Sequence, residues 1–162
     1  MRTLIRSIAL SVALTATQAT SAQTAENQEV LAAVHTLVNA WREPSVAKAD
    51  AVLHENYRAE SWQLSDKGRF VFLETRDHLL GQIATLRPGL WDVRLLHTSL
   101  NIDPNGLAVV WAKYVFYSDG RPNHCGYEAY TLIHTPHGWR VINFADTDTP
   151  LQGRSRDATC PG

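Results

Sequence analysis

The sequence predicts an α+β domain, with helices in its first half and an antiparallel sheet in its second half. Three observations lead to this fold class. Apolar residues recur at helical spacing before residue 87, and they alternate with period two after residue 91. Short turns rich in Pro and Gly separate the strand-like runs. Helices followed by a series of strands are typical of helices packed on one face of a curled sheet.

The first 22 residues have the pattern of a secretory signal peptide. Arg2 and Arg6 provide a positive start, residues 8–14 an apolar run, and residues 20–22 a small-residue cleavage site. An ordinary N-terminal helix is the alternative, which the lack of an amphipathic period disfavours. We expect a periplasmic or secreted protein with a domain over residues 23–150 and a tail over residues 151–162. No segment is apolar for long enough to predict a membrane span.

Charge and aromatic content indicate the kind of partner. The chain has 15 basic and 16 acidic residues and no basic stripe, which argues against nucleic acid as a partner. Five tryptophans and five tyrosines suit a core that opens into a ligand cavity. We therefore expect a small apolar or aromatic molecule as the partner.

Two cysteines, Cys125 and Cys160, predict a disulfide in an exported chain. The bridge would close a 36-residue loop and contribute about 3–4 kcal/mol in the chain-entropy model. A reactive thiol is the alternative. His124 next to Cys125 does not predict a metal site, because no second cluster with ligand spacing accompanies it.

Three helices are expected, over residues 26–43, 45–57 and 72–86, with a short strand over residues 57–64 between the second and the third. Ser45 is a plausible cap of the second helix. The residues expected to face inward from the first and third helices are Val30, Val34, Leu37, Val38, Trp41, Phe72, Leu79, Leu80 and Ile83. Trp41, Trp91 and Trp139 are interpreted as packing residues.

Four strands are expected over residues 91–102, 107–117, 125–135 and 139–147. The connections over residues 103–106 and 135–138 place Pro second and Gly fourth, as in hairpins with a glycine bulge. The third connection, over residues 118–123, contains Asp119-Gly120. An antiparallel meander is therefore predicted.

This order of elements, ending in the run "GWRVINFADT", resembles the nuclear transport factor 2-like superfamily, which includes ketosteroid isomerase and the SnoaL-like cyclases. The resemblance covers residues 26–150 and points to an exported bacterial subgroup of unassigned role. It implies a cone-shaped fold whose three helices pack on the concave face of the sheet and enclose a pocket. The chemistry in that pocket differs between members, so the fold does not by itself predict an activity.

Strand pairing predicts which side chains share a face, because side chains alternate along a strand. Ser118 opposite Asn123 sets Lys113 opposite Glu128, and Thr135 opposite Trp139 sets Glu128 opposite Asp146. The face that results contains Trp111, Lys113, His124, Glu128, Tyr130, Phe144 and Asp146.

Two interpretations fit this charged face. It is either the floor of a pocket or a solvated outer surface, where cross-strand ion pairs are common. We favour the pocket, because Cys125 then points outward, where the tail can reach it. A one-residue register slip would reverse the assignment for a whole strand.

The short strand adds Tyr57 and Trp62 as candidates at the pocket mouth. Glu60 is interpreted as a solvated strand residue, and Arg76 as a helix-surface residue that can also clamp an anion. The opposite, uncharged face, with Tyr114, Phe116 and Tyr127, is a candidate homodimer surface.

Two functions are compatible with these residues. The first is an exported small-molecule-binding domain without a cofactor or a metal. The alternative is an isomerase, dehydratase or cyclase in which His124 with Glu128 or Asp146 transfers protons. In that case Tyr130 or Lys113 would donate to the developing oxyanion.

Overall fold

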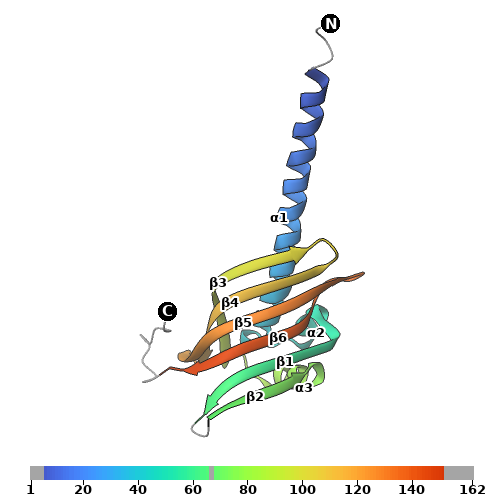
Figure 1. Cartoon of the computed structure of the whole chain (residues 1–162). Coiled ribbons are helices and arrows are strands. Elements are labelled where there is room, and N and C mark those ends of the chain that lie inside the picture. Colours follow the sequence, from blue (N-terminus) through green and yellow to red (C-terminus); the bar gives the residue numbers. More distant parts are fainter. Residues whose placement is uncertain (1–5, 66–67, 152–162) are drawn as a thin grey trace.

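The computed structural model describes residues 6–65 and 68–151, which form three helices and one six-stranded sheet (Figure 1). The helices are α1 (Arg6–Arg42), α2 (Val46–Val52) and α3 (Arg76–Thr85). The strands are β1 (Leu53–Ser65), β2 (Gly68–Thr75), β3 (Trp91–Asp103), β4 (Leu107–Ser118), β5 (Arg121–Thr135) and β6 (Gly138–Pro150). The predicted α+β class is confirmed.

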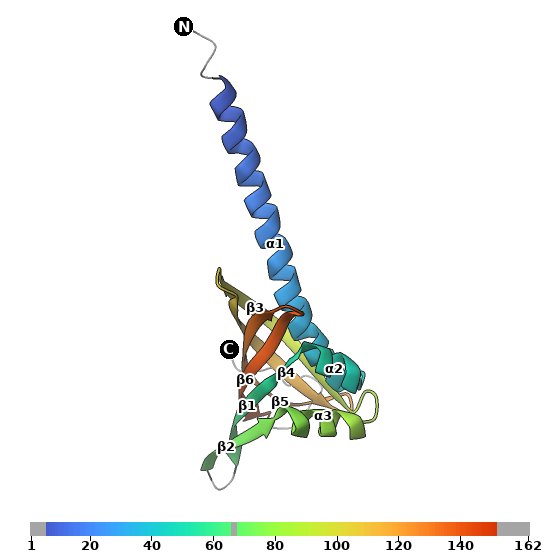
Figure 2. The ribbon, with the colours of Figure 1, turned by 90° about the vertical axis from the view of Figure 1, so that its right-hand side faces the viewer.

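The sheet has the order β2-β1-β6-β5-β4-β3 and is curled without closing (Figure 2). All neighbouring strands pair antiparallel except β1 and β6, which pair parallel. The last four strands form the predicted meander. β6 then brings β1 and β2 into the same sheet, so residues far apart in the chain become neighbours.

The helices share one hydrophobic core with the sheet. Val30 and Val34 of α1 and Leu79 and Ile83 of α3 belong to the cluster that contains Leu132 of β5. The N-terminal part of α1 extends away from the sheet (Figure 1). Within the described ranges, no helix is both long and apolar enough to cross a membrane. The signal peptide over residues 1–22 stays a prediction.

Helix α2 is shorter than predicted. Ser45 caps it, since its hydroxyl accepts a hydrogen bond from the Lys48 N–H at 3.3 Å, but the helix ends at Val52 instead of residue 57. β1 begins at Leu53, where parallel pairing with Val141 of β6 starts. Tertiary pairing therefore overrides the helical pattern of this segment.

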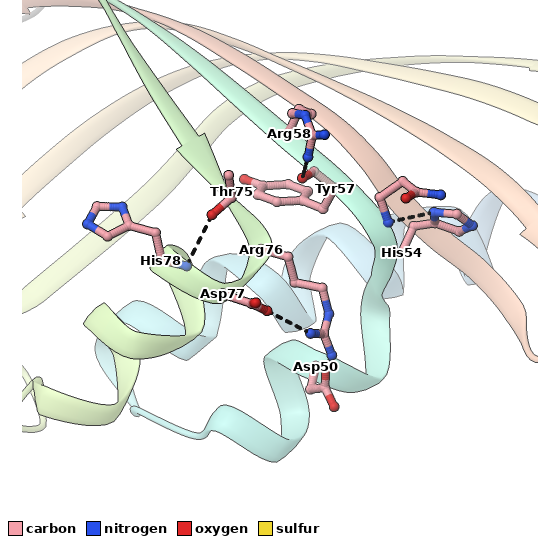
Figure 3. Close-up of polar contacts among 9 residues, drawn as sticks. Asp50, His54, Tyr57, Arg58, Thr75, Arg76, Asp77 and His78 are labelled. Atoms are coloured by element: carbon pink, nitrogen blue, oxygen red, sulfur yellow. Dashed lines mark hydrogen bonds and ion pairs between the residues drawn. The ribbon is translucent and has the colours of Figure 1, made fainter.

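Strand β2 was not predicted, and the expected third helix over residues 72–86 begins too early. Residues 68–75 pair antiparallel with β1, so Phe72 lies on a strand. α3 starts only at Arg76, where the Thr75 hydroxyl accepts from the His78 N–H (Figure 3). Arg76 forms ion pairs with Asp50 of α2 and with neighbouring Asp77, so it joins two helices (Figure 3).

The pairing predicted between β4 and β5 is wrong, by two residues at the turn and by one residue farther along the strands. Ser118 lies opposite Arg121, so the turn consists of Asp119 and Gly120 alone. Both have positive φ, 53° and 73°, as the tight two-residue hairpin turn requires. After a register shift at Phe116, Ala112 takes the predicted place of Lys113 opposite Glu128.

The pairing predicted between β5 and β6 is confirmed in the centre of the strands. Glu128 lies opposite Asp146, and Tyr130 lies opposite Phe144. Near the turn the pairing differs, because Thr135 lies opposite Gly138. A register shift between Thr131 and Leu132 restores the predicted register.

Gly126 of β5 permits a close approach of β6. A Cβ at this position would collide with the carbonyl oxygen of Thr147. The Tyr114 hydroxyl donates to the same oxygen at 3.0 Å, and the Thr147 hydroxyl accepts from the Tyr127 N–H at 3.0 Å. Gly126 thus holds three strands in contact beside the Glu128–Asp146 pair.

We predict that Gly126→Ala lowers the free energy of unfolding by about 1–3 kcal/mol, because the added methyl group overpacks a backbone contact. Urea unfolding measures the change. Gly81→Ala is the matched control. It lies in the middle of α3 with no atom within 4 Å of an added Cβ, so it should raise stability by up to about 1 kcal/mol. Equal stability of Gly126→Ala and the wild type would contradict the packing argument.

Candidate functional site

A cavity of about 390 Å³ lies between the sheet, α1 and α3, and every strand contributes to its lining. Six aromatic side chains contribute to its wall: Trp41, Phe72, Trp91, Tyr114, Phe116 and Phe144. Trp91 contacts Trp41 and Phe116 at ring-centroid distances of 5.6 and 5.8 Å. A smaller cavity of about 40 Å³ shares Trp41, Glu74 and Glu128 and is also lined by Tyr57 and Tyr130.

Three carboxyl groups are among the polar side chains of the cavity, which also include Ser61, Gln63, Gln82 and Tyr114. Glu74 of β2, Glu128 of β5 and Asp146 of β6 line it together with His124 of β5. The described lining residues include no lysine or arginine. Within residues 6–65 and 68–151, no group of three or more His, Cys, Asp or Glu side chains is arranged to hold a metal ion. The site therefore combines aromatic surface with carboxyl groups.

Glu128 is the most deeply buried of these carboxyl groups, with 3% of its surface exposed. The Tyr130 hydroxyl donates to its Oε2 at 2.6 Å. Burial, together with the charge of Asp146, raises the pKa of Glu128 to about 8 against the opposing effect of the hydrogen bond from Tyr130. Glu128 is therefore largely protonated at neutral pH.

Asp146 lies beside Glu128. One of its carboxylate oxygens has a hydrogen-bond donor nearby, and the other has no hydrogen-bond partner. The Tyr114 hydroxyl lies 3.2 Å from Oδ2, while Oδ1 is buried and accepts no hydrogen bond. Burial raises the pKa of Asp146, and the hydroxyls of Ser61 and Tyr114 oppose the shift. An orphaned carboxylate oxygen in a cavity wall can accept a donor or a cation from a ligand.

His124 is held by rings and by Asp148. Its imidazole stacks on Phe116 with a centroid distance of 4.6 Å and meets Tyr114 edge-on. Nδ1 lies 3.9 Å from Oδ2 of Asp148 and 3.0 Å from Oδ1 of Asn123. Burial lowers the pKa of His124, whereas the charge of Asp146 raises it. The net shift is downward, which favours the neutral imidazole.

Five of the eight predicted ligand-binding residues lie in these two cavities: Tyr57, His124, Glu128, Tyr130 and Asp146. Trp111 and Lys113 do not, and their predicted facing is wrong. Lys113 lies opposite Tyr127, and Trp111, half exposed, stacks on the Tyr127 ring at 5.4 Å. Both residues lie on the opposite face, because the register of β4 against β5 shifts by one residue between Phe116 and Tyr117.

Trp62 also lies on the opposite face, between the cavity-lining Ser61 and Gln63 of β1, and is exposed. Glu60 shares that face and accepts a hydrogen bond from the Asn143 side chain at 2.9 Å.

The predicted homodimer surface also requires correction. Tyr114 and Phe116 line the cavity, so they cannot form an outer contact, whereas Tyr127 is exposed on the outer face. Cys125 is buried on that same outer face of β5. Cys160 lies outside the described residues, so its bridge to Cys125 stays a prediction.

Several lining residues were not predicted. Trp41 and Trp91, interpreted as packing residues, line the cavity, and Glu74 was not considered. Glu74 forms an ion pair with Nδ1 of His78 at 3.1 Å, and burial raises its pKa while His78 opposes the shift. The alternation of Phe70, Phe72 and Glu74 was the signal for a strand, but the helical pattern that follows masked it.

Glu128 should make stability fall as pH rises. Below about pH 4.5 the carboxyl is protonated in both states. Between there and about pH 8 the unfolded chain loses the proton and the folded chain keeps it, so the free energy of unfolding decreases. Each pKa unit corresponds to about 1.4 kcal/mol.

We therefore predict that Glu128→Gln flattens this decrease and stabilises the protein by a few kcal/mol at about pH 9. Urea unfolding at several pH values measures it. Glu55→Gln, at an exposed position, is the matched control and should follow the wild type. The same pH slope in Glu128→Gln and the wild type would exclude Glu128 as the titrating group.

Comparisons with known proteins show the same fold without a function. No protein-family model and no curated protein matches the sequence. An NTF2-like protein with a cystatin-like fold from Novosphingobium aromaticivorans has 14% identity and a TM-score of 0.65, over 86% of this chain and 91% of that chain. A protein of unknown function from Mycobacterium tuberculosis has 13% identity and a TM-score of 0.63, over 80% and 75%.

An NTF2-like protein from Cytophaga hutchinsonii has 14% identity and a TM-score of 0.59, over 76% of this chain and 98% of that chain. At such identities the likeness shows the fold and leaves the activity open. The chain has the cone-shaped α+β fold of NTF2-like proteins.

Proposed function

We propose that this chain binds a small, largely apolar or aromatic molecule in the cavity between its helices and the concave side of its sheet. The observation that carries the proposal is the cavity of about 390 Å³, whose aromatic wall surrounds a few convergent polar groups. Cavities of this size and lining are typical of small-molecule sites. The fold is commonly used for binding ligands, which agrees with this function.

The neutral fluorescent probe N-phenyl-1-naphthylamine tests the cavity directly. We predict that it binds the native chain and that Gln82→Trp weakens binding at least about tenfold, since an indole from α3 would fill the space. Ala84→Trp adds the same ring at an exposed position of α3 and should bind like the wild type. Equal affinities in all three proteins would show that the probe does not occupy the cavity.

Proton transfer at carbon, as in an isomerase, dehydratase or cyclase, is a second candidate function. Glu128 favours it, because a buried carboxyl whose pKa is about 8 suits general acid–base chemistry near neutral pH. His124 lies in the same cavity, whereas Lys113, one of the two predicted oxyanion donors, faces away. Deuterium uptake by 2-tetralone in D₂O is the measurement, and no acceleration over buffer would exclude this activity.

We propose further that the mature chain is exported, begins at Gln23 and contains the bridge between Cys125 and Cys160. The N-terminal pattern supports export. The end of β6 supports the bridge, since Thr149 lies opposite Cys125 and the Leu151 N–H donates to the Asn123 carbonyl at 3.1 Å. The chain thus enters its last residues beside Cys125.

The mass of the protein isolated from periplasmic or culture fractions tests export and bridge together. We expect the mass of a chain that starts at Gln23, and we expect two cysteines that resist alkylation until they are reduced. An uncleaved chain with reactive thiols would contradict both parts.

A second copy of this chain is the proposed partner for the outer face of the sheet. The stacked pair Trp111 and Tyr127 is exposed there, near exposed Val109 and Leu107. Exposed apolar surface of this kind commonly marks an interface. Native mass spectrometry of the same sample should give twice the chain mass, and a single-chain mass would exclude the dimer.

A further inference from the structure

The lining of the cavity has an excess of acidic side chains. Three carboxyl side chains from three different strands, Glu74, Glu128 and Asp146, line it, and the described lining residues include no lysine or arginine. Glu74 pairs with Nδ1 of His78, which lies outside the lining. Glu128 and Asp146 have no such counterpart among the described ion pairs.

The hydrogen bonds of the two carboxyls leave room for a ligand. Glu128 receives its hydrogen bond from Tyr130 on Oε2, whereas the single proton of the Tyr114 hydroxyl is shared between Oδ2 of Asp146 and the Thr147 carbonyl. Oδ1 of Asp146 is buried without a partner. A buried acceptor of this kind is costly unless something supplies a donor or a positive charge.

The rings around these carboxyls suit the same kind of occupant. Trp41, Trp91 and Phe116 form a connected wall, and Phe144 packs on Tyr130 at a centroid distance of 5.1 Å. The negative faces of aromatic rings attract organic cations, most strongly when water is excluded. Aromatic walls with carboxylates are the usual surroundings of bound alkylammonium groups.

We propose that the cavity binds a small organic cation, an aryl- or alkylammonium, with its charge against Glu128 and Asp146 and its hydrocarbon part against the aromatic wall. This inference rests on the proposed function, since it names the class of molecule that the same cavity takes. An anionic ligand would meet three carboxyl groups and no lysine or arginine among the described lining.

The groups that surround Glu128 come from every strand packed around it. Some of these groups titrate or carry charge. They are Tyr57 of β1, Glu74 of β2, Tyr114 of β4, His124 and Tyr130 of β5, and Asp146 and Asp148 of β6. His78 of α3 pairs with Glu74. Burial raises the pKa of each tyrosine far above neutrality, so these tyrosines stay neutral donors. Burial also favours neutral His124. Glu128 is the group whose pKa, about 8, allows a change of charge near neutral pH.

Cation binding should therefore release a proton. A positive charge beside Glu128 favours its ionised form, so the carboxyl ionises as the ligand enters. Affinity for a cation that cannot itself titrate should rise by at least about tenfold between about pH 6 and about pH 9. Affinity for a neutral molecule of similar shape should not rise.

Calorimetry on the full chain with three matched probes tests this. The probes are benzyltrimethylammonium, neutral N,N-dimethylphenylacetamide and the anion 3-phenylpropanoate. We expect the cation to bind at least about tenfold tighter than the amide at about pH 9, and the anion to bind weakest. In two buffers of different ionisation enthalpy, the cation alone should show proton release.

Variants test whether the charge of the cavity carboxyl groups, and not the fold of the chain, controls cation binding. Glu128→Gln should remove both the pH dependence of the cation's affinity and the proton release on cation binding, whereas exposed Glu55→Gln should behave as the wild type. Asp146→Asn is a second variant, and we expect it to weaken the binding of the cation selectively. Equal, pH-independent binding of cation and amide would overturn the inference and leave the proposed cavity function standing. If neither these probes nor N-phenyl-1-naphthylamine binds, both proposals are wrong.

Discussion

The register of β5 against its two neighbours is the constraint on which the cavity depends. Phe116 of β4 lies opposite His124, and Asp146 of β6 lies opposite Glu128. Side chains alternate along a strand, so a shift of one residue would exchange the lining of the cavity for the outer face. Gly126 secures this arrangement, because only a residue without a side chain lets the Thr147 carbonyl approach β5.

Burial of carboxyl groups in an aromatic surrounding is the chemical result of that register. Removing a carboxylate from water favours its protonated form, and Glu128 and Asp146 also repel each other's charge. The fold tolerates this cost, which is typical of sites where function and stability conflict. The same property suits a proton donor and a receptor for a positive charge, so binding and proton transfer draw on one set of residues.

Much of the candidate site could be predicted from the alternation of β5 and β6 alone. His124, Glu128, Tyr130 and Asp146 were placed correctly, because each strand has only two faces and its pattern separates them. Trp111 and Lys113 were misplaced because the register of β4 against β5 shifts by one residue between Phe116 and Tyr117, and no local pattern predicted this irregularity. The turn itself was interpreted as too long, although the Asp119-Gly120 pair was the local signal for a tight turn.

Local periodicity and turn chemistry were enough to predict the α+β class, the four-stranded meander and the pairing of Glu128 with Asp146. They did not predict that residues 68–75 form a strand beside β1, or that Glu74, Trp41 and Trp91 line the cavity. The physical reason is that these residues come from segments far apart in the chain. The parallel pairing of β1 with β6 and the packing of α1 bring them together, and no local pattern encodes such distant contacts.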